Sequence, residues 1–236
     1  MSMDANHLIN TLFPQGAEID FDGEFFTGTG QVGDKIVAVL GTQGGVYIGV
    51  ELAHRMAGIV LDTVRNHPGR PILLLVDTKG QRPSRRDELL GINGYMAHLA
   101  KCLDLARRQG HRTIGLVWSQ AVSGGFLASS LLADECYALP DAEVRVMNLP
   151  AMSRVTKIPL ERLEALSLDN PVFAPGVENY RRMGAIRDFW QGDLAACLAT
   201  ALDSPTGPDR RRAHGLEREG RLMAYKVAER VRHDPV

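Results

Sequence analysis

Two glycine-containing turns carry the residue types best suited to chemistry in this chain. The segment SQAVSGGFLASSLLA, residues 119–133, follows the apolar run TIGLVW and places Gly124 and Gly125 at the start of a predicted helix. A helix start leaves backbone N–H groups without partners, and glycine lets a ligand approach them closely. With no charged residue beside them, the amides of Val122, Ser123, Gly124 and Gly125 are predicted to stabilise an oxyanion developing on a carbonyl or thioester. Ser123 could also take the cap position of this helix.

A second turn, DTKGQRP, follows another apolar run, PILLLVDT. Ligands of parallel α/β sheets sit at the carboxyl edge of the strands, so we expect the amides of Gly80 and Gln81 to join the first set there. Asp77 is predicted to cap the turn with its carboxylate. The alternative for these glycines is close packing of a helix against a strand.

Several polar side chains near the predicted edge are weaker candidates for binding a substrate. Gln120 and Asn93 could orient it, while Arg82 and Arg154 could meet a carboxylate or phosphate. The alternative for both arginines is a solvated surface. His54 and His98 lie in the predicted helices, and Tyr47 and Tyr95 could donate a proton. For all four, packing is the competing interpretation. Glu51 and His54 do not form an HExxH pattern, so no metal site is predicted.

The composition limits the class of protein. The chain has 236 residues, 44% of them hydrophobic, and a formal net charge of −1. No overall field would draw it to nucleic acid or to an anionic membrane. Its three cysteines form no CxxC pair, which favours a reduced compartment. We find no signal peptide and no apolar run of 18 residues, and therefore expect a cytoplasmic protein.

Strands and helices alternate along the chain. Apolar runs predict strands at 35–40, 71–78 and 113–118, and helical spacing predicts helices at about 48–60 and 89–106. This alternation predicts an α/β fold with right-handed crossovers. We expect one domain over residues 1–205, in which residues 1–30 are a loose entry, and a charged helical tail over 206–236. A hinge is predicted at 203–208.

The tail raises a question of its own. Four apolar residues are predicted to share one helical face: Leu216, Met223, Val227 and Val231. Such a face could dock on the domain or bind a partner.

The order of these motifs is similar to that of a known family. A strand with DTKG, a long helix, SQAVSGGFLASS and DECYALPDAEVRVMNLPAM together resemble the carboxyltransferase branch of the crotonase superfamily over about residues 35–200. Within that branch the chain looks most like the gamma subunits of biotin-independent malonate decarboxylases. The resemblance implies a crotonase-like ββα superhelix of the carboxyltransferase alpha (C-domain) type. Two departures are DTKG in place of DTPG, and Gln120, Ala121 and Val122 where many relatives carry glycines.

The resemblance also implies an activity and partners. A homologous beta subunit would complete an active site at the subunit interface. The substrate would be a malonyl thioester on the phosphopantetheine-type, dephospho-CoA-derived arm of an acyl carrier subunit, loaded by an acyl-carrier transferase subunit. The products would be acetyl thioester and CO2. This chain itself would bind no cofactor, no biotin and no metal.

Three alternatives stay open at this point. The chain could be an alpha-type carboxyltransferase subunit of an acyl-CoA carboxylase. It could be a ClpP-like serine peptidase with Ser123 as nucleophile and His98 as base. It could also be a scaffolding half whose partner does the chemistry.

Overall fold

A single mixed sheet forms the centre of the molecule. The computed structural model describes residues 4–169, 174–205, 207–220 and 222–233. Its main strands lie in the order β1 (Ala17–Asp22), β2 (Phe25–Val32), β3 (Lys35–Thr42), β5 (Ile72–Gln81), β6 (Thr113–Val122) and β7 (Glu135–Ala138). The first three are antiparallel, and β5, β6 and β7 continue parallel to β3. Two short strands, β4 (Val46–Ile48) and β8 (Glu143–Arg145), pair with the carboxyl ends of β5 and β6. The α/β prediction is confirmed.

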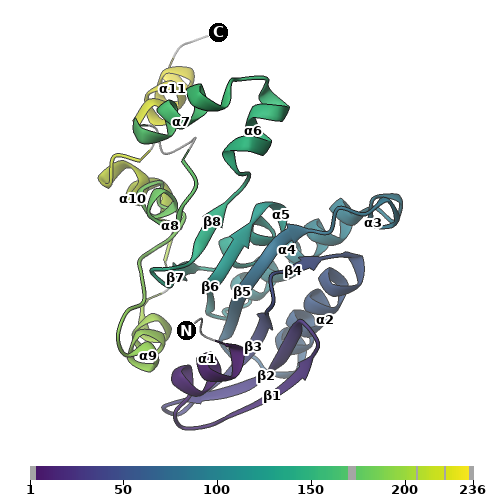
Figure 1. The fold of residues 1–236 in the computed structure, drawn as a ribbon. Helices are drawn as coiled ribbons and strands as arrows, with labels where there is room; N and C mark the ends of the chain where they lie inside the picture. Colours follow the sequence, from purple (N-terminus) through teal and green to yellow (C-terminus); the bar gives the residue numbers. More distant parts are fainter. Residues whose placement is uncertain (1–3, 170–173, 206, 221, 234–236) are drawn as a thin grey trace.

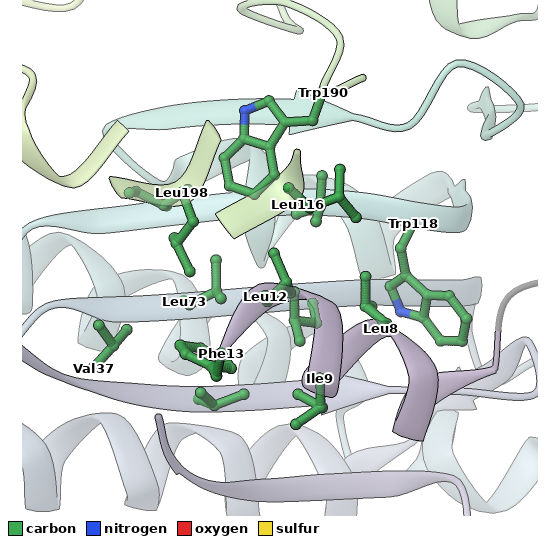
Figure 2. Packing of buried hydrophobic residues seen from close by; sticks show 14 of the residues in the cluster. Leu8, Ile9, Leu12, Phe13, Val37, Leu73, Leu116, Trp118, Trp190 and Leu198 are labelled. Atoms are coloured by element: carbon green, nitrogen blue, oxygen red, sulfur yellow. The ribbon is translucent and has the colours of Figure 1, made fainter. Parts of the chain in front are cut away.

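Helices cover both faces of this sheet (Figure 1). α2 (Val50–Asn66) and α4 (Ile92–Arg108) pack on one face, and their helical spacing buries Met56, Val60, Met96 and Leu103. α1 (Ala5–Leu12) and α9 (Leu194–Asp203) cover the other face. Figure 2 shows this second cluster, in which side chains from both ends of the chain meet across the strands. The packing holds the carboxyl edge of the parallel strands in place.

The expectation of a loose N-terminal entry is wrong for the described part of residues 1–30. This segment forms α1, β1 and β2, and Leu8, Leu12 and Phe13 are almost completely buried. The sequence suggested turns because the segment is rich in glycine. Gly30 instead lies inside β2, where an added Cβ would come within 2.4 Å of the Phe13 ring. The glycine allows close packing in a strand.

The strands that lead to the two turns are longer than their apolar runs. β5 continues through Lys79 to Gln81, and β6 continues to Val122, because β4 and β8 supply pairing partners there. The helix after β6 is correspondingly short. α5 covers Ser123–Leu127 and is followed by a 3-10 turn at Ser130–Leu132.

The remaining helices build an arm above the sheet (Figure 1). They are α6 (Leu149–Thr156), α7 (Leu160–Asp169), α8 (Val177–Arg182), α10 (Arg211–Glu217) and α11 (Leu222–His233), while α3 (Arg85–Leu89) precedes α4. No helix in the described ranges is long and apolar enough to cross a membrane.

The tail is two helices, so the prediction of one shared apolar face is wrong. Glu219, between them, has a left-handed backbone with φ of 58°. Leu216 on α10 lines an apolar cavity with Tyr180 and Met183, whereas Met223, Val227 and Val231 on α11 are exposed. The domain boundary at 205/206 stays a prediction. Thr206, in the predicted hinge, lies outside the described residues.

Candidate active site

The two glycine turns lie against each other at the carboxyl edge of the sheet. A Cβ atom added to Gly125 would be 2.9 Å from Cα of Gly80. A Cβ atom added to Gly80 would be 2.9 Å from the carbonyl oxygen of Val122 and 3.2 Å from Cβ of Ser123. The structure therefore brings the two segments together, and it does so through backbone contacts that exclude larger residues.

Gly80 serves packing and does not offer a free amide. Its N–H donates to Oγ1 of Thr78 at 3.0 Å, and Thr78 is fully buried. The backbone φ of Gly80 is 100°, in the region that favours glycine. The prediction that Gly80 donates to an oxyanion is therefore wrong in this structure, because the donor is already engaged inside the protein.

A sharp change of backbone direction separates β6 from α5. Val122 is extended and occupies the cap position, and Ser123 follows with φ of 51°. Ser123 is thus the first helical residue, not the cap, and the side chain of the cap residue Val122 makes no capping hydrogen bond. Donation by the amides of Val122, Ser123 and Gly125 stays a prediction.

The Gly124 amide is capped from the other turn. Its N–H donates to Oε1 of Gln81 at 3.0 Å, in an exposed contact between residues 43 positions apart. Gln81 thus takes part through its side chain, which sequence reasoning missed when it predicted a role for the backbone amide. The side chain occupies the position from which a substrate oxygen would accept the same hydrogen.

An apolar groove of about 500 Å³ opens at Gly124. Gln81, Glu88 and Asn93 are its polar lining residues. That Asn93 orients a substrate stays a prediction. The apolar lining comes from α4 and from the segment after β6: Ile92, Met96, Ala97, Ala100, Leu127, Ala128 and Leu132. A groove of this kind suits an uncharged acyl chain or thioester, with the Gly124 amide as a polar contact at its side.

Gln120 lies over the turn between β3 and β4. A Cβ atom added to Gly45 would be 2.5 Å from Nε2 of Gln120 and 3.3 Å from Nζ of Lys79. Asp77 caps this turn, accepting the Gly45 N–H at Oδ2 over 2.8 Å. The prediction that it caps its own DTKGQRP turn is wrong, because those residues continue strand β5 as far as Gln81. Sequence reasoning did not single out Lys79 as a candidate binding residue, although its position at the end of a buried strand could have indicated it.

The two candidate arginines are elsewhere. Arg82 lies beside Asp87, where its Nη1 would be 3.0 Å from a Cβ on Gly49, and it lines a cavity with acidic Glu24 and Glu51. Its charge therefore faces carboxylates of this chain. Arg154 is exposed on α6, in the arm. Neither is grouped with the glycine turns.

The two candidate histidines, His54 and His98, contact each other between α2 and α4. The ring of His98 lies 3.7 Å from Sγ of Cys102 and stacks with His54 at 6.4 Å between α4 and α2. No hydrogen bond joins Ser123 to a histidine in the described part of the chain, which removes the support for a serine peptidase. In the same ranges no three His, Cys, Asp or Glu side chains are grouped to hold a metal ion.

Comparison with known proteins gives the family. Residues 43–235 match the family model of the malonate decarboxylase gamma subunit. The chain belongs to this family. The resemblance predicted over about residues 35–200 is therefore confirmed for both glycine turns, and the family match extends beyond the predicted range into the tail.

Relatives of this gamma-subunit chain include a curated protein and several solved structures. The Malonyl-S-ACP:biotin-protein carboxyltransferase MADD of Malonomonas rubra is 31% identical, and the match covers 85% of this chain and 80% of that protein. A Pseudomonas malonate decarboxylase hetero-tetramer in complex with coenzyme A has a TM-score of 0.78 and 24% identity, with 95% of this chain and 97% of that chain covered. The transcarboxylase 12S core has a TM-score of 0.69 and 20% identity; 85% of this chain matches 41% of that chain. These likenesses confirm the crotonase-like fold.

Proposed function

We propose that this gamma subunit, with a homologous beta subunit, decarboxylates a malonyl thioester on an acyl carrier subunit to an acetyl thioester and CO2. The observation that carries the proposal is the Gly124 N–H, which lies at an apolar groove and is covered by the exposed side chain of Gln81. A substrate oxygen can displace an exposed neutral side chain at small cost.

The reaction places a negative charge where these amides could stabilise it. The bond between the carboxylate and the α-carbon breaks, and its electron pair forms an enolate with charge on the thioester oxygen. CO2 leaves, and a proton adds to the α-carbon. Hydrogen bonds from Gly124 and from the neighbouring amides of Val122, Ser123 and Gly125 would stabilise the enolate oxygen, and losing one such donor typically costs about 100-fold in rate.

The groove agrees with a substrate carried on a flexible arm. Its apolar lining along α4 would contact the acyl end of a phosphopantetheine-type arm, while Asn93 orients it. The structures of hetero-dimeric and hetero-tetrameric Pseudomonas malonate decarboxylase support a partner subunit for this chain. Acyl carrier and acyl-carrier transferase subunits complete the proposed complex, which we place in the cytoplasm. In this proposal the chain binds neither biotin nor another cofactor.

Carboxyl transfer to a biotin protein is the second candidate, because the curated relative from Malonomonas rubra carries that name. Both reactions begin with the same bond cleavage and need the same enolate stabilisation. They differ in the fate of the carboxyl group.

The deciding experiment uses the native complex, purified through a tag on this chain. Malonate and the acyl donor for loading the carrier are supplied, and CO2 release is measured with and without avidin. Release that avidin does not inhibit supports the decarboxylase. Release that avidin abolishes supports transfer through biotin, and an intact complex that releases no CO2 contradicts both.

A further inference from the structure

Two hydrogen-bond donors from different strands converge at one point beside the glycine turns. Lys79 is near the end of β5 and Gln120 is near the end of β6. A Cβ atom on Gly45 would meet Nε2 of Gln120 at 2.5 Å, Cε of Lys79 at 3.0 Å and Nζ of Lys79 at 3.3 Å. Only a glycine at position 45, with its φ of 63°, leaves room for both side-chain ends.

The charge at this point is not neutralised by a surface ion pair. Within the described ranges, Lys79 forms no ion pair with a carboxylate, in contrast to Arg55, Arg86 and Arg145. Lys79 is exposed and Gln120 is half-buried, so a ligand can reach both. An ammonium and a primary amide present several N–H donors and match the two oxygens of a carboxylate.

A buried carboxylate supports the Gly45 turn. Asp77 is 4% exposed; its Oδ2 accepts the Gly45 N–H, and its Oδ1 has no hydrogen-bond partner among the described residues. A buried acceptor without a partner is unfavourable, so the hydrogen bond from the Gly45 N–H matters for this carboxylate. Asp77 therefore helps to hold the Gly45 turn, beside which the ends of Lys79 and Gln120 lie.

We propose that Lys79 and Gln120 bind the free carboxylate of the malonyl thioester, the group that leaves as CO2. This inference rests on the proposed function and adds the residues that would distinguish a malonyl from an acetyl group. Lys79 directly precedes Gly80, which contacts Val122 and Ser123. Gln120 likewise lies two residues before Val122 on β6. The Lys79–Gln120 pair and the amide turn thus follow one another along both strands, in the order that the carboxylate and thioester ends of a malonyl group would need.

The test compares two pantetheine thioesters on the native complex. In S-sulfoacetyl-pantetheine a sulfonate replaces the carboxylate, so the compound keeps the anion and cannot lose CO2. S-acetyl-pantetheine lacks the anion. We expect calorimetry to show that the wild-type complex binds the sulfoacetyl compound about 10- to 100-fold more tightly, the range of a hydrogen bond to a charged group.

Substitutions then assign this preference to the pair. Lys79→Met should remove most of it without changing the binding of the acetyl compound, and Lys79→Arg should keep part of it. Gly45→Ala should also reduce it, because the added methyl group takes the space of both side-chain ends. The control is Lys226→Met, which removes one positive charge from the exposed face of α11 and should leave the preference intact.

The outcomes separate this inference from the function on which it rests. If a Lys79→Met complex keeps the full preference for the sulfoacetyl compound, Lys79 and Gln120 do not bind the carboxylate. This conclusion holds even if CO2 release shows that the complex is a decarboxylase. A wild-type complex that binds neither thioester and releases no CO2 overturns the proposed function, and the inference with it.

Discussion

At the scale of the residue, the Gln81 side chain covers the Gly124 amide. Gln81→Glu keeps the shape of the side chain and turns the acceptor into a carboxylate. A charged acceptor binds an amide more strongly than a neutral one, by about 1 kcal/mol or more. We therefore expect kcat/KM for CO2 release to fall about tenfold, and Gln81→Ala to match or exceed the wild type.

The control for Gln81→Glu is Gln191→Glu, the same change on an exposed residue before α9. It should have no effect on turnover. Wild-type kcat/KM in the Gln81→Glu complex would show that the substrate does not use the Gly124 amide.

Substitutions of the adjacent glycines Gly124 and Gly125 provide a second test at the scale of the residue. A methyl group on Gly125 would collide with the backbone of Gly80, whereas one on Gly124 would meet only the end of the Gln81 side chain, at 2.7 Å. Gly125→Ala should therefore lower the free energy of unfolding by about 1–3 kcal/mol. Gly124→Ala should fold normally and lose turnover.

Thermal unfolding and CO2 release on the same two complexes check this pair. A folded Gly124→Ala complex with unchanged turnover would favour the alternative in which this chain is a scaffold and its partner carries out the chemistry. Gly125→Ala could not decide that question, because its first effect is on packing.

At the scale of the element, Asp87 joins two helix starts. It is 1% exposed; its Oδ1 accepts the Val50 N–H of α2 at 2.8 Å, and it also bonds with Ser84 at the start of α3. The hydrogen bond from Ser84, then that from the Val50 backbone, lowers the pKa of Asp87 below its ordinary value. The carboxylate therefore stabilises the fold above the unfolded pKa of about 3.9, and this contribution is lost as the pH falls through the lower folded pKa.

Asp87→Asn should remove this part of the acid dependence. Melting temperatures of the wild type and Asp87→Asn should differ most near neutral pH and converge in acid. Asp141→Asn, at an exposed turn, is the control and should shift little at any pH. A constant difference between wild type and Asp87→Asn at all pH values would contradict the role of the charge.

The elements also show which parts of the site a sequence can predict. The buried strands before DTKG and SQAVSGG have strong apolar runs, and parallel strands place their ends at one edge, so the meeting of the two turns was predictable. The side-chain contacts were not. Gln81 reaches Gly124 across 43 residues, and Lys79 meets Gln120 over Gly45 only because the register of β4, β5 and β6 brings them together.

At the scale of the whole molecule, Arg218 joins the tail to α8 and to the segment that follows it. Arg218, after α10, donates from Nη1 to the carbonyl oxygens of Arg181 at 2.8 Å and Ile186 at 3.1 Å, and from Nη2 to that of Arg187 at 2.9 Å. A basic residue in a charged tail would be expected on a solvated surface. Here the side chain replaces water at three backbone acceptors, which makes the tail part of the fold.

Arg218→Met keeps much of the side-chain length and removes all three donors. Because net hydrogen bonds to charged groups are worth about 1.5–3 kcal/mol each and water recovers part of the loss, we expect a destabilisation of about 2 kcal/mol. For a chain of this size that lowers the melting temperature by roughly 5 °C. Limited proteolysis should then cleave between α9 and α11 faster than in the wild type.

The control is Arg210→Met, which removes an exposed ion pair with Glu217 at 3.4 Å and should cost less than about 1 kcal/mol. If the two substitutions lower the free energy of unfolding equally, the hydrogen bonds of Arg218 do not hold the tail in place. Apolar contacts around Leu216 would then do so.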